Sequence, residues 1–131
     1  GAYDAHYRID LDHIFMPTFA SFRDASAQMG TLLHEAAHAT GAKHRLDRNF
    51  AERFKRDSLA IEEICAELPA SFVLADLGIA HPPRADHAAY VASWLRALKD
   101  DPRAIFTAAS KAQAAADWMH AQQPQPEEIA A

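Results

Sequence analysis

The residues best suited to chemistry lie in segment 34–38, which reads H-E-A-A-H. Residues four apart on a helix project from the same face, so the imidazoles of His34 and His38 can bind one metal ion. Glu35, one residue around the helix, would then act as general base on a zinc-bound water. The pattern predicts zinc-dependent hydrolysis, with two histidine ligands and one catalytic glutamate.

A catalytic zinc site needs a third protein ligand, and the sequence offers candidates on two segments. His44 completes the longer pattern H-E-x-x-H-x-x-G-x-x-H, although such sites also have a methionine turn and the only later methionine, Met119, falls in a predicted helix. Glu63 lies in an apolar stripe of a second predicted helix, where a carboxylate needs a cation or a partner. Glu62 is a weaker candidate for burial, and Glu67 could orient a ligand histidine from behind.

A basic stretch that includes Arg45 and Arg48 lies between these two helices. We interpret it as a solvated loop near the predicted metal. The alternative is that it meets phosphate or an acidic substrate. For the glutamates, the alternative to metal binding is that Glu62, Glu63 and Glu67 pair with Arg45, Arg48 or Arg53, since buried acidic residues usually have partners. The residues themselves therefore leave the third ligand open.

A β-hairpin and about four helices are expected to position these groups. Alanine is abundant and β-branched residues are sparse, which favours helices over a sandwich or barrel. The hairpin is predicted from two short alternating runs, Tyr7–Ile9 and His13–Met16. The helices are expected from about Phe22 to Thr40 with Ser21 as N-cap, from about Ser58 to Leu77, from Asp86 to about Leu98, and from Asp101 to about Ala121.

The helix that carries the two histidines is expected to be covered on both sides. Small, nearly uncharged residues surround His34 and His38, which leaves room for a second helix to approach them. The ordinary core face of this helix is predicted from Ala25, Met29, Leu32, Leu33 and Ala36. The core stripe of the second helix is predicted from Ile61, Ile64, Cys65, Leu68, Phe72 and Ala75.

Length and composition exclude several classes of protein. The 131 residues predict one domain over 1–121, followed by a disordered tail over 122–131. The net charge of −5 makes the chain a poor candidate for holding a nucleic-acid backbone by itself. One cysteine excludes an internal disulfide, and there is neither a signal peptide nor an apolar run near ~20 residues. We expect a cytoplasmic domain without a membrane partner, and the sequence does not indicate an oligomeric state.

The order and spacing of these motifs resemble the C-terminal zincin-like metallopeptidase domain of ArdC-type antirestriction proteins, which is related to domains of phage and plasmid polyvalent proteins. The resemblance covers nearly the whole chain, to about Trp118. It is carried by DHIFMP (12–17) with Phe22, TLLHEAAH (31–38) with Thr40-Gly41, Arg45-Leu46 with Arg48, EEICAEL (62–68), Ala89-Tyr90 with Ser93-Trp94-Leu95, LKDD (98–101), and Ala104-Ile105-Phe106 with Ala108-Ala109.

The resemblance implies a mainly α, gluzincin-type α+β domain in which His34, His38 and Glu63 hold zinc and Glu35 is the general base. The position of His44 is not usually histidine in the family, which favours Glu63 as third ligand. A peptide or protein substrate is implied, together with protection of incoming plasmid DNA from restriction enzymes. DNA would be bound through an N-terminal domain outside this chain. The alternative is a catalytically silent, metal-stabilised module that acts in antirestriction through DNA or protein contacts.

Overall fold

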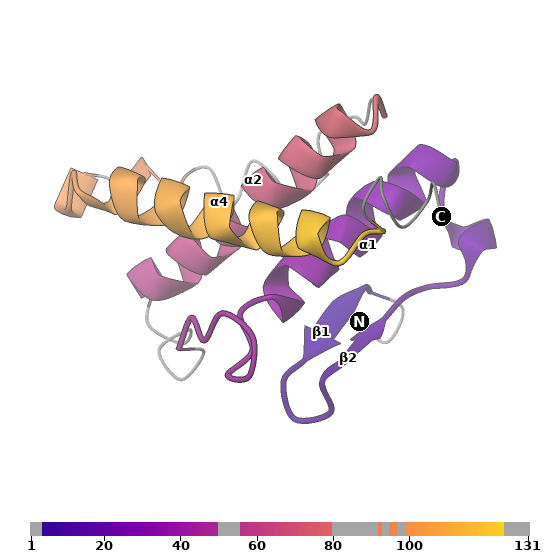
Figure 1. Cartoon of the computed structure of the whole chain (residues 1–131), viewed down its shortest axis with the longest axis horizontal. Coiled ribbons are helices and arrows are strands. Elements are labelled where there is room, and N and C mark those ends of the chain that lie inside the picture. The colour runs from indigo at the N-terminus through magenta and orange to yellow at the C-terminus, as the bar shows by residue number, and fades with distance from the viewer. Residues whose placement is uncertain (1–3, 50–55, 80–91, 93–94, 97–98, 125–131) are drawn as a thin grey trace.

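The computed structural model describes residues 4–49, 56–79, 92, 95–96 and 99–124, with only the backbone of residues 56–60. No helix in this part of the chain is long and apolar enough to cross a membrane. The elements follow in the order β1 (His6–Arg8), β2 (His13–Phe15), a short 3-10 turn η1 (Phe19–Ser21), α1 (Ala25–Ala39), α2 (Arg56–Asp76) and α4 (Ala104–Ala121) (Figure 1).

Helix α2 is the central element of the described fold. It packs against α1 and against α4, which contact each other little, and the hairpin lies against α1 (Figure 1). Because apolar side chains of all three helices are removed from water where α2 meets its neighbours, this contact holds the domain together. The buried centre of the contact between the three helices is formed by Ala37, Ala66, Val73 and Met119, and Leu33, Ala36 and Trp118 pack against it.

The start of α1 differs from the prediction. Asp24 is the N-cap, in an extended conformation, and its side chain accepts a hydrogen bond of 2.8 Å from the backbone N–H of Ala27. Ser21 instead ends the 3-10 turn, and Phe22 is extended. The predicted cap at Ser21 was therefore wrong, because this turn uses the residues just before the helix. The C-terminal cap at Thr40 agrees with the predicted end.

The remaining elements follow the sequence pattern with small shifts. The hairpin is antiparallel, and Tyr7 lies opposite Ile14. The helices predicted over about 58–77 and 101–121 are confirmed as α2 and α4. The helix predicted from Asp86 to about Leu98 falls mostly outside the described residues, which contain three α-helices rather than about four. The same applies to residues 125–131 of the predicted tail. Helix α4 ends at Ala121, and the domain boundary at that residue stays a prediction.

The most buried face of α1 is the one that carries the first histidine. His34, Glu35 and Ala37 are buried, whereas the predicted core face of this helix is half-buried and Ala25 is exposed. Because α2 packs on the histidine side, small residues there permit a close approach of the two helices. Along α2 the predicted core stripe is likewise only partly right, since Phe72 is 40% exposed.

Candidate metal site

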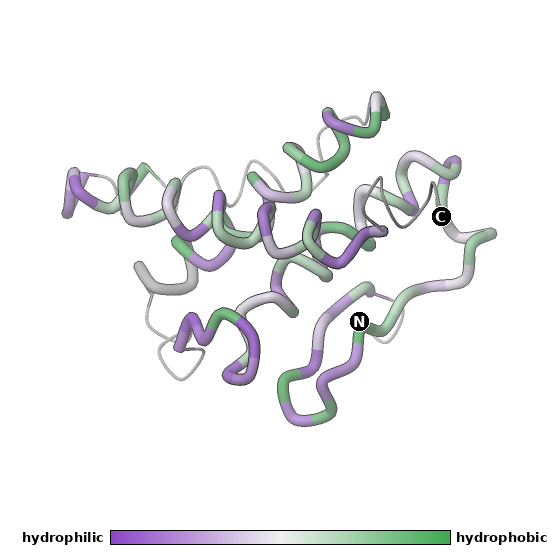
Figure 2. The backbone as a smooth tube through the Cα atoms, in the orientation of Figure 1, coloured by the Kyte–Doolittle hydropathy of each residue, from purple (hydrophilic) through white to green (hydrophobic). Residues whose placement is uncertain are grey.

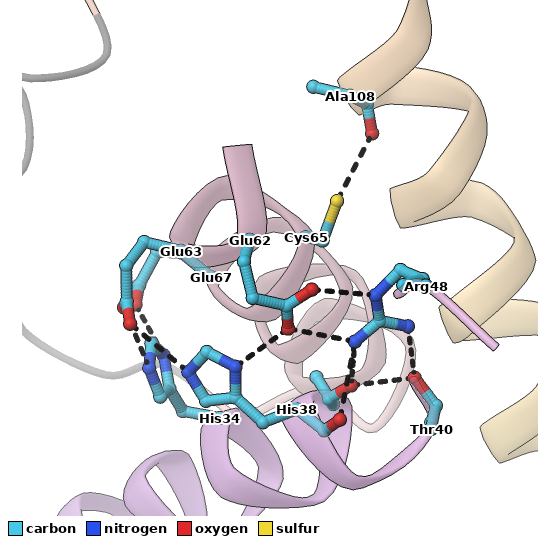
Figure 3. A network of polar contacts seen from close by, with 10 residues as sticks. His34, His38, Thr40, Arg48, Glu62, Glu63, Cys65, Glu67 and Ala108 are labelled. Carbon is cyan, nitrogen blue, oxygen red and sulfur yellow. Dashed lines mark hydrogen bonds and ion pairs between the residues drawn. The ribbon is translucent and has the colours of Figure 1, made fainter. Parts of the chain in front are cut away.

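Two imidazoles of α1 and one carboxylate of α2 converge where these helices meet (Figure 3). Nε2 of His34 lies 3.3 Å from Oε2 of Glu63, and Nε2 of His38 lies 3.3 Å from Oε1 of the same side chain. One ligand atom from each residue falls within 4.8 Å of the others. The structure therefore brings together the three residues that the sequence predicts as ligands.

This donor set fits a divalent metal ion. Two ligands at about 2.1 Å from a tetrahedral zinc lie about 3.4 Å apart, which matches the nitrogen–oxygen separations of 3.3 Å. His34 and Glu63 are almost fully buried, at 3% and 8% exposure. The Glu63 carboxylate is buried between two imidazole nitrogens, and a metal ion that binds there would replace the protons that now link these groups.

Each imidazole is held from behind by a second carboxylate of α2 (Figure 3). Nδ1 of His34 lies 2.7 Å from Oε2 of Glu67, and Nδ1 of His38 lies 2.8 Å from Oε2 of Glu62. A carboxylate that accepts from Nδ1–H fixes the tautomer and the ring orientation, and leaves Nε2 as the ligand atom. The orienting role predicted for Glu67 agrees with this geometry, and Glu62 has the same relation to the second histidine.

When no metal is bound, the carboxylates around the site favour the protonated form of His38. Burial by itself lowers the pKa of His38, but hydrogen bonds to Glu62 and Glu63 outweigh burial and raise it to about 9. Burial likewise raises the pKa of Glu63, whereas hydrogen bonds from His34 and His38 lower it to about 2. Both shifts arise from the same buried ion pair, so a metal ion must displace a proton from His38 to bind.

Glu35 follows His34 directly in α1 and is 6% exposed. It belongs neither to the ligand group nor to the pair of carboxylates behind the histidines. Its role as general base stays a prediction.

His44 lies apart from the pair of candidate histidine ligands. Its side chain is 63% exposed, and Nε2 is 3.3 Å from Oδ2 of Asp12 and 2.7 Å from Nη1 of Arg45. The loop after Gly41 thus directs this histidine toward the hairpin rather than toward His38. The longer histidine pattern in the sequence does not correspond to a spatial cluster.

The interpretation of residues 42–49 as a solvated loop is wrong at Arg48, and the alternative, an arginine paired with a buried glutamate, is confirmed for Glu62. The loop is mostly hydrophilic (Figure 2). The side chain of Arg48 is nevertheless only 4% exposed, and Nε donates a hydrogen bond of 2.9 Å to Oε1 of Glu62. The signal was the pair of adjacent glutamates, since two carboxylates in one buried turn require a cation.

Comparison with known proteins places this chain in a protein family. Residues 1–111 match the zincin-like metallopeptidase family, and the chain belongs to it. The chain is 57% identical over 123 residues to the uncharacterized protein y4eC of Sinorhizobium fredii (strain NBRC 101917 / NGR234), which covers 94% of this chain and 40% of y4eC. It is 45% identical over 116 residues to a DNA primase TraC of Escherichia coli, covering 88% of this chain and 11% of that protein.

Two crystal structures of the antirestriction protein ArdC from plasmid R388 have the same fold over this region. Both are 50% identical to the chain and cover 87% of it. The TM-score is 0.77 for the metal-free structure and 0.79 for the Mn(II)-bound structure. The chain spans 41% to 42% of the ArdC chains and a smaller share of the primase.

Proposed function

We propose that this chain is a zinc-dependent, peptidase-like hydrolase domain with His34, His38 and Glu63 as metal ligands. The observation that carries the proposal is the convergence of both Nε2 atoms on Glu63, with a carboxylate behind each ring. Catalytic zinc sites use three protein ligands and keep a fourth position for water or substrate. The geometry supports this class better than a purely packed histidine pair.

The chemistry divides between the metal and the protein. When bound, the ion would act as a Lewis acid on water and on the substrate carbonyl. Glu35 would accept a proton from water as its oxygen attacks the amide carbon, and would deliver that proton to the nitrogen as the C–N bond breaks. The buried position of Glu35 in α1, directly after His34, supports this role.

Two features argue for chemistry rather than for a silent, metal-stabilised module. The chain resembles the metal-free and the Mn(II)-bound ArdC structures almost equally, which is expected when the ion serves a reaction rather than the fold. The described core is also formed by apolar side chains of α1, α2 and α4 rather than by the metal ligands.

The substrate we propose is an extended segment of a peptide or protein. Strand β2 pairs with β1 on one side and lies against α1, the helix that carries the histidines. A peptide could add to the other edge of β2, a common mode of peptide recognition. In a longer antirestriction protein related to ArdC, this domain would supply the hydrolase centre. DNA would be bound by another region, because this chain carries a net charge of −5.

Metal analysis and peptide cleavage test the proposal in two steps. We expect one zinc or manganese ion per wild-type chain, loss of the ion in His34→Ala, and an unchanged metal content in the matched control His44→Ala. We expect Glu35→Gln to keep the metal and to lose cleavage of a mixed peptide library. Metal retained by His34→Ala contradicts the ligand assignment, whereas cleavage at the wild-type rate by Glu35→Gln contradicts the mechanism.

A further inference from the structure

The buried guanidinium of Arg48 holds Glu62 at both of its carboxylate oxygens. Nε donates to Oε1 and Nη2 to Oε2, each at 2.9 Å (Figure 3). The two side chains are 4% and 10% exposed. A forked guanidinium on a carboxylate fixes its plane as well as its position, which a single ammonium contact does not.

The same guanidinium is tied to the end of α1. Nη1 donates a hydrogen bond of 2.7 Å to Oγ1 of Thr40, and Nη2 donates one of 2.8 Å to the backbone oxygen of Ala37. Arg48 therefore joins the last turn of α1 to the carboxylate on α2 that accepts from Nδ1 of His38. Arg48 thus contacts Ala37 and Glu62, each of which directly precedes a candidate ligand in the sequence.

The backbone around Arg48 is shaped to insert this side chain. Asp47 and Asn49, on either side, have φ angles of 48° and 56° in the left-handed region. Asp and Asn adopt this region more readily than other residues besides glycine, so both residue types suit the tight turns on either side of Arg48. The backbone N–H of Arg48 donates to the oxygen of Gly41 at 3.0 Å, which folds the loop back onto the end of α1.

We propose that Arg48 is a positioning residue of the metal site, an inference that rests on the metal binding proposed above. By holding both oxygens of Glu62, Arg48 keeps that carboxylate behind the ring of His38 and prevents it from competing with Glu63 as a ligand. The arginine thus selects which of the two adjacent glutamates faces the metal.

Cobalt(II) binding tests this role independently of any activity. We expect the wild-type chain to bind one Co(II) with a defined visible absorption spectrum. Arg48→Lys keeps the charge but loses the fork, and we expect its Co(II) affinity to fall about 10- to 100-fold, with a changed spectrum. If the wild-type chain binds no Co(II), Zn(II) or Mn(II), the proposed function and this inference both fail.

Two further variants separate positioning from stability. Arg45→Met is the matched control, because Arg45 also donates to a carbonyl of α1, that of Ala39 at 2.7 Å, but pairs with Asp12 instead of Glu62. We expect this variant to keep the wild-type affinity and spectrum.

The double variant Arg48→Met with Glu62→Gln leaves no unpaired buried charge and guards against simple unfolding of the single variant. We expect its Co(II) affinity to equal that of Glu62→Gln alone, because Arg48 acts through Glu62. All binding is measured well below each variant's Tm. Wild-type affinity and spectrum in Arg48→Lys, or fully additive losses in the double variant, overturn the proposal even if wild-type metal binding is intact.

Discussion

Nδ1 of His34 lies 2.7 Å from Oε2 of Glu67, one helical turn beyond the candidate ligand Glu63. The two carboxylates therefore contact opposite nitrogens of the same buried ring, since Nε2 of His34 lies 3.3 Å from Glu63. Glu63 of α2 contacts Nε2, the nitrogen that would face a metal, and Glu67 of the same helix contacts Nδ1. The i and i+4 spacing of the glutamates provides both contacts from one helix face.

Glu67→Gln is expected to weaken metal binding without abolishing it. The glutamine amide oxygen can still accept from Nδ1–H, but the loss of charge makes the imidazole a poorer donor to the metal. We expect the zinc dissociation constant to rise about 10- to 100-fold, as measured by competition with a chromophoric chelator.

Asp76→Asn is the matched control for this substitution. Asp76 also lies on α2 and pairs with a histidine, His120, at 2.8 Å, but that pair is exposed and lies outside the candidate ligand group. An equal loss of zinc affinity in the two variants would contradict an orienting role for Glu67.

The pKa values at the site predict how the stability of the metal-free protein depends on pH. The pKa of His38 is raised from 6.5 to about 9, so its stabilising contribution is complete below pH 6.5 and is lost as the pH rises toward 9. The pKa of Glu63 is lowered from 4.5 to about 2, so its contribution is complete above pH 4.5 and is lost as the pH falls toward 2. These two groups together predict highest stability between pH 4.5 and 6.5.

Thermal unfolding in the presence of a chelator measures this profile. We expect the Tm to fall between pH 6.5 and 9, and to fall less in His38→Gln. Saturating zinc should reverse the trend, because the metal binds the neutral imidazole and its stabilising effect grows as the pH rises. A chelated wild-type protein with a flat profile between pH 6.5 and 9 would contradict the assigned pKa of His38.

Asp12 is expected to dock the hairpin on the end of α1. It accepts a hydrogen bond of 2.6 Å from the hydroxyl of Tyr7 and is paired with Arg45, which holds the carbonyl of Ala39. The Arg45 guanidinium is the main cause that lowers the pKa of Asp12 from 3.8 to about 2. Because the folded pKa is depressed, the docking contribution is complete above pH 3.8 and is lost as the pH falls toward 2.

Amide hydrogen exchange tests this docking. In Asp12→Asn we expect faster amide exchange in residues 6–8 and 13–15. Exchange in α4 should be unchanged, because Tyr7, Asp12 and Arg45 join the hairpin to α1 and not to α4. Zinc affinity should stay at the wild-type value, because the contacts of Asp12 are to Tyr7, His44 and Arg45 rather than to His34, His38 or Glu63. Slow exchange of the hairpin in this variant would show that other contacts hold it.

The sequence predicted the helix that carries the candidate histidine ligands, and its partner helix, well, because these depend on local spacing. These properties belong to short segments: two histidines four residues apart, a glycine after the helix, and a second helix that has a core stripe and a further apolar stripe containing Glu63. The sequence left the pairing of Arg48 with Glu62 as one of several alternatives, because the choice depends on how residues 42–49 fold back onto α1. The start of α1 was predicted too early, because Ser21 and Asp24 are both favourable N-cap residues. The 3-10 turn that ends at Ser21 decides between them, and this turn depends on tertiary packing.

Close packing between α2 and α4 predicts that one substitution has unequal effects at two positions of α4. Ala112 is fully buried, whereas Ala109, one turn earlier in the same helix, is exposed. Leucine and alanine are both strong helix formers, so the difference reports packing rather than helix propensity. We expect Ala112→Leu to lower the free energy of unfolding by about 1–3 kcal/mol, because the added atoms overpack the contact.

Ala109→Leu, the matched control, is expected to change the free energy of unfolding by less than about 0.5 kcal/mol. Urea denaturation of both variants in chelator measures the two values without a contribution from metal binding. Since Cys65 lies on the facing side of α2, with Sγ 4.0 Å from the oxygen of Ala108, its alkylation rate gives a second readout. Overpacking at Ala112 should expose this buried thiol, and equal destabilisation of the two variants would mean that α4 does not pack in the orientation described.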